Sequence, residues 1–537
     1  MTPVVRFYWV ITLIVLPLST LWLHNSTGGF TSSALQHPVQ LLLFAVALAW
    51  AVVGGYELLL SPSNLRRNYP VLANIRYLLE FFRPEIQQYF ISNNQEEKPF
   101  SRERRNLIYR RAKGLDDTIP FGTEQDVLAD GHRSLLHSIN AHKVAEEHAR
   151  VSFGGPECKK PYNASRLNIS AMSFGSLSSN AIQALNKGAA LGGFAHNTGE
   201  GGLSAHHLKH GGDLIWQIGT GYFGCRNQQG RFDDGAFAER ASKDSVKMIE
   251  IKISQGAKPS HGGVLPGAKV TQEIADIRLV EVGKTVNSPA IHPEFSTPIG
   301  LLEFVQRLRE GCGGKPVGFK LCLGKKKEFL SIIRAMLETR ILPDFITIDG
   351  SEGGTGAAPV EFTNRLGVPC LEATNYVNQV LIGAGLRDDI RLISSGLTAT
   401  GFDMLEKVAV GANSVNAARS MMLALGCVQA RHCNTNKCPT GVATQDPSRA
   451  RAVDVESKAI RVRNFHDATV EAFLDLCGAM GLQDPDDLTP HDLLRREDDG
   501  TKSFRQLYEP LNPGQLLSRE IPDSYAEDWA QSRAAAF

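Results

Sequence analysis

The chain has 537 residues, enough for one large barrel with appendages or for two or three ordinary domains. Its formal net charge is +1 and no arm is rich in lysine and arginine, which argues against a nucleic-acid partner. Nine cysteines in a chain of this length do not make a disulfide scaffold, so we expect the main body to fold in a reducing compartment.

The first sixty residues contain two long apolar runs. Phe7 to Leu23 is almost unbroken, and Val39 to Leu60 is interrupted by only a few polar residues and glycines. Each run is about long enough to cross a bilayer as a helix. A cleavable signal peptide is the alternative for the first run, but no convincing small-residue cleavage site follows it. We therefore expect residues 1–60 to form a transmembrane helical hairpin.

The basic residues around these runs indicate an orientation. Arg6 precedes the first run and Arg66 and Arg67 follow the second, whereas the linker from His24 to Pro38 contains no lysine or arginine. By the positive-inside rule both ends of the hairpin face the cytoplasm. We expect the protein in the inner (cytoplasmic) membrane, with its catalytic body on the cytoplasmic side.

Residues 61–150 are polar and mixed, and we expect a helical connector there. The stretch from Ile75 to Phe90 has apolar residues at helical spacing, which fits a helix on the membrane surface or one packed on the main domain. The basic run from Arg102 to Lys113 fits a solvated helix face or contact with anionic lipid.

From residue 151 to about residue 485, short β-rich segments alternate with stretches of helix length. Such alternation predicts a parallel sheet with right-handed crossovers, and this many repeats favour a closed (β/α)8 TIM barrel. Its chemistry should lie at the carboxyl ends of the strands, where glycines and polar residues gather. Residues 486–537 form a polar C-terminal tail in this interpretation. Nine segments compete for the eight strand positions: LNISAMSFG, GGFAHNTGEGG, LIWQIGTGYFG, IEIKISQGAKP, TVNSPA, PVGFKLCLG, DFITIDGSEGG, IRLISSG and SVNAARS.

Three cysteines lie close together on one late loop. Cys427, Cys433 and Cys438 have the spacing C-x5-C-x4-C, with Pro439 directly after the last. Three soft thiolates on one loop indicate a metal, and the missing fourth ligand favours a three-iron cluster over a four-iron cubane. The alternatives are a zinc site completed by His432, a cluster with a ligand from elsewhere, and unrelated buried thiols.

Several strand ends predict an anion site and a flavin site. The segments from Ile393 to Gly401 and from Asn416 to Ser420 offer backbone N–H groups after the last two strands, the usual phosphate-binding position of this barrel. Lys320 could point inward and stabilise a reduced flavin, or could extend to solvent. Lys258 could hold a substrate carboxylate, or could be a solvated loop lysine.

Six motifs, in order along roughly residues 100–482, resemble the FMN-binding synthase domain of glutamate synthase. The chain looks like the short, stand-alone, membrane-anchored branch of that family. The motifs are AMSFGSLS, NTGEGG, GYFG, IKISQGAKPSHGGVLPGAKV, DGSEGGTGAAP and the cysteine loop ending in GVATQ.

The resemblance implies an FMN-containing barrel with a 3Fe-4S cluster beside the flavin. In this family 2-oxoglutarate and ammonia form 2-iminoglutarate, which takes a hydride from reduced FMN to give L-glutamate. The resemblance places 2-oxoglutarate carboxylates near Gln255 and Lys258, and arriving ammonia at Glu200. It places the iron of the cluster on Cys427, Cys433 and Cys438. The residues that it places against FMN are Met172, Ser173, Lys320, Gly396, Ala417 and Ala418.

The sequence also departs from the large enzymes of this family. We expect no glutaminase domain, so ammonia would be free or would come from a separate source. His261 replaces an acid in the motif SHGG, and the segment SPAIHPEF also differs, so the substrate could differ. No nicotinamide fingerprint is convincing, which implies ferredoxin or a separate reductase subunit as electron donor.

Three hypotheses follow. The first is a glutamate-synthase-type oxidoreductase. The second is a membrane-tethered flavin and iron-sulfur electron-transfer oxidoreductase that acts on a different substrate or amine. The third, a non-enzymatic scaffold, is disfavoured because a scaffold does not require the three thiolates and the strand-end motifs.

Overall fold

The computed structural model describes residues 3–27 and 38–537, and the chain divides into two compact units, Met1–Arg102 and Glu103–Phe537. In the first unit, α1 (Pro3–Thr27) packs against α2 (Pro38–Leu59). Both helices are long and apolar enough to cross a membrane, as the expected hairpin requires. Most of the expected uncharged linker, residues 28–37, lies outside the described residues.

The two apolar helices approach each other closely at one glycine. A Cβ added to Gly54 of α2 would lie 2.2 Å from the Tyr8 ring of α1, so only glycine admits this ring. The Tyr8 hydroxyl donates to the Ala51 carbonyl at 2.7 Å. The first unit continues through α3 (Asn64–Asn68), α4 (Leu72–Ile86) and a π-helical turn (Gln87–Ile91).

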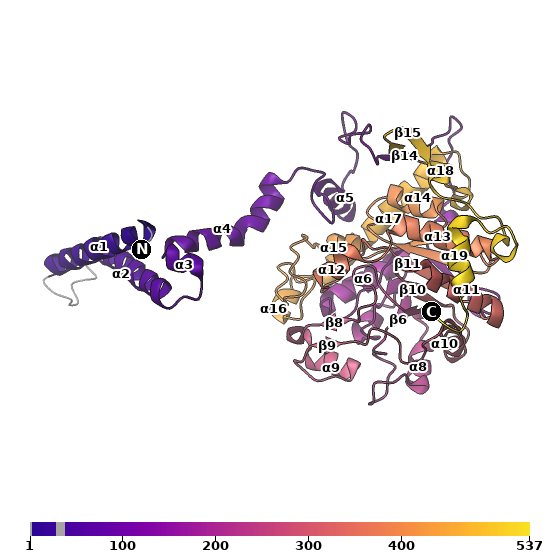
Figure 1. The fold of residues 1–537 in the computed structure, drawn as a ribbon, viewed down its shortest axis with the longest axis horizontal. Coiled ribbons are helices and arrows are strands. Elements are labelled where there is room, and N and C mark those ends of the chain that lie inside the picture. Colours follow the sequence, from indigo (N-terminus) through magenta and orange to yellow (C-terminus); the bar gives the residue numbers. More distant parts are fainter. Residues whose placement is uncertain (1–2, 28–37) are drawn as a thin grey trace. The chain divides into compact units, whose positions relative to one another are not determined.

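The second unit is built on a closed barrel of eight parallel strands, which confirms the predicted TIM barrel (Figure 1). The surplus candidate, TVNSPA, is not a barrel strand. It contains β9 (Val286–Asn287), which pairs antiparallel with β8 (Val264–Leu265). The barrel strands are β4 (Leu167–Ile169), β5 (His196–Asn197), β6 (Leu214–Ile218), β7 (Val246–Lys252), β10 (Val317–Leu321), β11 (Phe345–Asp349), β12 (Arg391–Ser395) and β13 (Ser414–Ala417).

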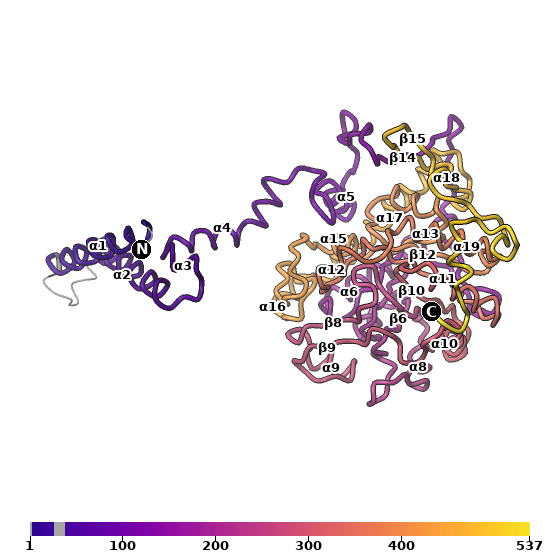
Figure 2. Tube along the Cα trace, in the orientation of Figure 1, coloured from indigo at the N-terminus to yellow at the C-terminus, as the bar shows by residue number. Residues whose placement is uncertain are grey.

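Helices surround the barrel, as the path of the chain in Figure 2 shows. The Ser178 hydroxyl caps α6 by accepting from the Ala181 N–H, and Thr400 and Asp403 form a capping box on α14. A long helix, α17, packs against α6 and α14. The principal helices are α6 (Ser179–Gly192), α8 (Asp234–Ala241), α10 (Pro298–Gly311), α11 (Lys326–Thr339), α13 (Cys370–Gly383), α14 (Gly401–Ala409), α15 (Arg419–Leu425) and α17 (Val455–Ala479).

The C-terminal segment is folded onto the barrel. Its last helix, α19, packs against α11, where the Arg334 guanidinium lies 4.1 Å from the centre of the Trp529 ring. Leu511 and Leu516 belong to the main hydrophobic core. The remaining elements are α5 (Arg102–Ala112), α7 (Ala205–Leu208), α9 (Gln272–Arg278), α12 (Val360–Arg365), α16 (Pro447–Ala450), α18 (Phe504–Leu507), α19 (Asp523–Gln531), β1 (Arg133–Leu135), β2 (Arg150–Phe153), β3 (Tyr162–Ser165), β14 (Leu493–Glu497) and β15 (Gly500–Ser503), with β1, β14 and β15 in one antiparallel sheet and β2 and β3 in another.

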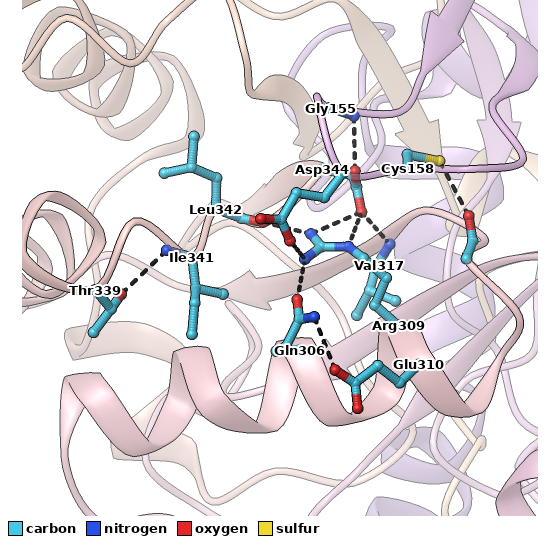
Figure 3. A network of polar contacts seen from close by, with 12 residues as sticks. Gly155, Cys158, Gln306, Arg309, Glu310, Val317, Thr339, Ile341, Leu342 and Asp344 are labelled. Carbon is cyan, nitrogen blue, oxygen red and sulfur yellow. Dashed lines mark hydrogen bonds and ion pairs between the residues drawn. The ribbon is translucent and has the colours of Figure 1, made fainter.

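The amino-terminal end of the barrel is closed by a fully paired polar network (Figure 3). Asp344 directly precedes β11 and is 1% exposed. Its carboxylate accepts from the Gly155 and Val317 N–H groups, both at 2.7 Å, and from the Arg309 guanidinium at 3.2 Å. Arg309 also donates to Gln306 and to the Leu342 carbonyl. Asp344 and Arg309 therefore use their charges within the network.

Candidate active site

Charged side chains converge on the opposite, carboxyl-terminal end of the barrel. Lys252 ends β7, and its Nζ lies 2.8 Å from Glu200 Oε1 in the loop after β5. Lys320 on β10 lies beside Lys252 in the sheet register, with its Nζ 3.4 Å from Asp349 Oδ2 at the end of β11. The Lys252 and Lys320 side chains are buried, so both charges are shielded from solvent.

Glycines make room for the Glu200 carboxylate. A Cβ on Gly263 would lie 2.6 Å from Glu200 Oε1, and one on Gly219 would lie 2.7 Å from Glu200 Cβ. Burial acts to raise the pKa of Glu200, but Lys252, Lys258 and Arg278 outweigh it and hold the pKa below its ordinary value. Three cations thus surround one carboxylate, which leaves surplus positive charge for an anionic ligand.

Lys258 is the third lysine at this end of the barrel. The residue is 2% exposed, so it is not a solvated loop lysine. Burial lowers its pKa to about 8, Glu200 opposes this shift and Lys252 adds to it. A lysine in this state gains its full charge when a carboxylate binds beside it.

A buried carboxylate, Glu250, lies in the barrel interior below these lysines. It accepts hydrogen bonds from Asn197 at 2.8 Å, from Gln217 at 2.7 Å and from Thr347 at 2.7 Å, which belong to three other strands. Burial acts to lower the pKa of Lys320, but Asp349 and Glu250 outweigh it and raise the pKa. Lys320 therefore remains a buried cation.

Some buried polar atoms at this end are left without partners. In the described part of the chain, Gln255 Nε2 and Asn416 Oδ1 have no hydrogen-bond partner. Gln255 follows β7 and Asn416 lies on β13, so both are carried by elements that end at this side of the barrel. An unpaired buried polar atom costs free energy, so this arrangement suits a site that a ligand completes.

The residues that the resemblance assigns to FMN lie around the same end. Met172 and Ser173 follow β4, Gly396 follows β12, and Ala417 and Ala418 lie at the end of β13 and just beyond it. The loops touch: a Cβ on Gly199 would lie 2.7 Å from the Ser173 nitrogen. A Cβ on Gly396 would lie 2.8 Å from Glu352 Oε1. Backbone of Met172 and Ser173 lines the first approach, and the Glu352 and Cys370 side chains line the second, so glycine is required at both positions.

The three cysteines of the late loop are free thiols. Burial raises the pKa of Cys427 to about 11, and the charges of Cys433 and Cys438 add to this rise. Burial acts to raise the pKa of Cys438 too, but hydrogen bonds led by the Ala443 backbone N–H lower it overall. Soft thiols that feel one another's charge match the donor chemistry of iron or zinc. Within residues 3–27 and 38–537, however, no three His, Cys, Asp or Glu side chains stand in metal-site geometry.

Helix α5 contributes contacts that the sequence did not reveal. Arg104 donates to the Leu397 carbonyl at 3.0 Å and pairs with Asp403. The Tyr109 hydroxyl donates to the Cys427 carbonyl at 2.6 Å. The basic run is therefore neither a solvated face nor lipid-facing throughout. Helix α5 instead contacts the loop after β12 and the first cysteine of the late loop, two segments that are distant from it in the sequence.

Sequence reasoning also missed Lys252, Arg278, Glu250 and His292. His292 contacts the Lys252 carbonyl through Nε2 at 2.9 Å and the Tyr222 hydroxyl through Nδ1 at 3.0 Å. Burial lowers the pKa of His292 to about 4, so the ring is neutral and supports the end of β7. The only available signal was the position of His292 in the divergent segment SPAIHPEF.

The substituted residue His261 lies one turn from Lys258. Its backbone N–H donates to the Lys258 carbonyl at 3.3 Å, and its ring packs edge-on against Phe362 at 5.2 Å between ring centres. The contact with Lys258 is therefore made by the backbone, and the His261 ring contacts Phe362.

Comparison with known proteins identifies the family. Residues 124–483 match the family model for the conserved region in glutamate synthase. The glutamate synthase large subunit-like protein YerD of Bacillus subtilis (strain 168) is 38% identical over 478 residues, which cover 82% of this chain and 91% of that protein. The archaeal glutamate synthase (NADPH) of Methanocaldococcus jannaschii is 36% identical over 315 residues, 58% of each chain.

Among solved structures, a mandelate oxidase variant with an FMN adduct covers 80% of this chain and 99% of that one at a TM-score of 0.40 and 13% identity, a likeness from which no function follows. The sequence matches confirm the resemblance in the motifs: this chain belongs to the glutamate synthase family and is a glutamate synthase-like oxidoreductase.

Proposed function

We propose that the protein makes L-glutamate by reducing 2-iminoglutarate, the imine of 2-oxoglutarate and ammonia. The observation that carries this proposal is the surplus positive charge around Glu200, to which the buried Lys258 contributes. A dicarboxylate with an electrophilic carbon needs such cations, first to bind and then to stabilise the developing negative charge.

The side chains at the carboxyl-terminal end of the barrel have different roles in this reaction. Lys258 and Gln255 bind the carboxylates, because one is a buried cation and the other has an unpaired amide donor. Glu200 stays ionised at neutral pH, so its carboxylate can accept a hydrogen bond from arriving ammonia and direct the nitrogen lone pair toward the carbonyl carbon. Lys258 in its charged form holds the proton that makes the imine a better hydride acceptor.

FMN fits the loops at this end and supplies the hydride when bound. Backbone of Gly396, Ala417 and Ala418 would hold its phosphate, while Met172 and Ser173 would lie against its ring. Lys320, a buried cation, would stabilise negative charge on the reduced ring.

A 3Fe-4S cluster on Cys427, Cys433 and Cys438 would relay single electrons from ferredoxin or a separate reductase subunit. Its support is three free, mutually influencing thiols on one loop, and zinc with the exposed His432 is the competing occupant. Ammonia would be free or would come from a separate source.

We assign the catalytic domain to residues 151–485, after the hairpin (1–60) and the connector (61–150) and before the C-terminal segment (486–537). The hairpin would anchor the protein in the inner membrane, with the catalytic domain on the cytoplasmic side. Two long apolar helices support the anchor.

A second candidate is a membrane-tethered flavin and iron-sulfur oxidoreductase that acts on a different substrate or amine. The observation that favours it is His261 next to Lys258, where the resemblance expects an acid. This change would alter the charge that the second half of a substrate meets.

Stopped-flow reoxidation tests the proposal. The full-length protein is photoreduced without oxygen and mixed with 2-oxoglutarate and ammonium, together and separately. We expect rapid flavin reoxidation and L-glutamate only with both. Absence of acceleration by the pair rejects the first function, and acceleration by another oxo acid with an amine supports the second.

A further inference from the structure

Helix α4 of the N-terminal unit exposes a continuous row of large apolar side chains. We call Leu72, Ile75, Leu78, Leu79, Phe82 and Ile86 the apolar face of α4, because at the helical repeat they fall on one side, about 120° wide. Leu79 is 59% exposed and Phe82 is 47% exposed. An exposed, contiguous apolar surface of this kind is typical of a site of interaction with a membrane or another protein.

The other side of α4 is fixed to the end of α2. The buried Glu57 carboxylate accepts from the Val71 N–H and from Asn74 Nδ2, each at 2.6 Å. The hydroxyls of Tyr77 and Ser63 lie 3.0 Å apart. These contacts hold α4 to the end of an apolar helix long enough to span a bilayer, and the N-terminal unit itself leaves the apolar face exposed.

Charge complements this apolar face. The segment from residue 61 to 91 contains four arginines, Arg66, Arg67, Arg76 and Arg83, against two glutamates. Arg76 and Arg83 lie at the edge of the apolar face, where their long stems can run along lipid. The Arg76 Nε donates to Glu80 Oε1 at 2.8 Å, an exposed pair that leaves its other guanidinium nitrogens to reach phosphates. An apolar face bordered by arginine is typical of helices that lie in a bilayer surface.

The spacing of the apolar face also suits a coiled coil, so a second copy of the chain is the competing occupant. Leu72, Ile75, Leu79, Phe82 and Ile86 follow a seven-residue repeat. The positions beside this seam do not favour pairing, because Arg76 and Arg83 would face Leu78 or another cation rather than an acid. The charges therefore favour an anionic lipid surface over a second copy.

We propose that α4 lies in the headgroup region of an anionic bilayer, with its apolar face toward the acyl chains. This inference rests on the proposed membrane anchor and adds to it a second, lateral attachment. Glu57 would set the depth of α4, because it joins the helix to the end of α2.

Photo-crosslinking in the full-length protein tests this placement. An encoded benzophenone amino acid replaces Phe82 on the apolar face, Glu80 on the opposite side as the matched control, or Leu48 in α2 as the reference for the hairpin. Each protein is placed in nanodiscs of phosphatidylcholine with phosphatidylglycerol, irradiated, and analysed by mass spectrometry for lipid and protein adducts.

We expect lipid adducts at positions 48 and 82, and several-fold fewer at position 80. Omitting phosphatidylglycerol should lower the lipid adducts at position 82 about fivefold, as expected for loss of an arginine–anion contact. An unchanged yield would overturn the anionic preference.

Protein adducts at position 82, to a second copy or to the same chain, would overturn the proposal. So would lipid adducts at 48 without any at 82. Lipid adducts at 82 without any at 48 would uphold α4 and reject the hairpin anchor, which separates the two ideas.

Discussion

The two ends of the barrel both bury charged groups but use them differently. At the amino-terminal end, Asp344 and Arg309 satisfy each other and nearby backbone groups, as Figure 3 shows. At the carboxyl-terminal end, cations outnumber the carboxylate they surround, and Gln255 keeps an unpaired donor. A saturated network stabilises the fold, whereas an unsaturated one is held ready for a ligand. Substitutions at the two ends should therefore affect different measurements.

The largest effect should come from the saturated end. Asp344→Ala leaves the Arg309 charge buried without its main partner, so we expect a loss of about 3–5 kcal/mol in the free energy of unfolding. Denaturant unfolding measures it. The control Glu157→Gln removes a half-exposed partner of Arg309 and should cost less than about 1 kcal/mol. Equal losses would mean that Asp344 is not the centre of the network.

Lys258→Met should show the opposite behaviour. We expect kcat/KM for 2-oxoglutarate to fall about 10²–10³-fold, because a cation that stabilises developing charge is lost. The free energy of unfolding should not fall, since burial disfavours the charged form of Lys258 and lowers its pKa. Lys284→Met, at a lysine whose side chain is 70% exposed, is the matched control and should change neither quantity. A large loss of stability would make Lys258 structural.

Gly263→Ala should disturb the active end more mildly. The new Cβ would lie 2.6 Å from Glu200 Oε1 and displace this carboxylate, an overpacking that typically costs about 1–3 kcal/mol. We expect KM for ammonium to rise more than KM for 2-oxoglutarate in steady-state kinetics. Gly324→Ala, where nothing lies within 4 Å, is the control. A uniform fall in kcat with unchanged KM values would argue against an ammonia site at Glu200.

The pKa of Lys258, lowered by burial to about 8, predicts a pH dependence. Lysine is charged below its pKa, so raising the pH through about 8 removes the cation and weakens 2-oxoglutarate binding by about tenfold per unit above it. Calorimetric titration measures the affinity for 2-oxoglutarate from about pH 6.5 to about pH 10, a range that brackets the pKa of Lys258. Lys258→Arg keeps its charge and should flatten the profile. The same fall in the arginine variant would assign the titration to another group.

Tyr109→Phe should give the smallest effect. It removes the hydrogen bond to the Cys427 carbonyl, worth about 1 kcal/mol, and leaves the barrel intact. We expect a changed cluster EPR line shape with normal FMN content. Arg110→Gln, on the exposed side of the same helix, is the control and should leave the spectrum as it is. An identical spectrum in both variants would mean that α5 does not position the cysteine loop.

The sequence predicted the barrel because strands and helices leave local patterns. Apolar runs such as DFITIDG and IRLISSG end in glycine, and each became a barrel strand. Register is not local: Lys252 and Lys320 are neighbours in the sheet, yet only Lys320 was singled out.

Contacts made across long sequence distances were the least predictable. The partners of Arg104 lie at Leu397 and Asp403, so a basic run that suits solvent or lipid instead packs on the barrel. The C-terminal segment reads as polar, because Leu511, Leu516 and Trp529 are too widely spaced to form a pattern.

The most direct test of the account is the cofactor content of the anaerobically purified full-length protein, by absorption, metal analysis and EPR. We propose that the carboxyl-terminal end of the barrel binds a flavin and that the three cysteines bind iron beside it. This account predicts one FMN per protein chain and the EPR signal of an oxidised three-iron cluster. A preparation without flavin, or one with zinc in place of iron, would contradict it.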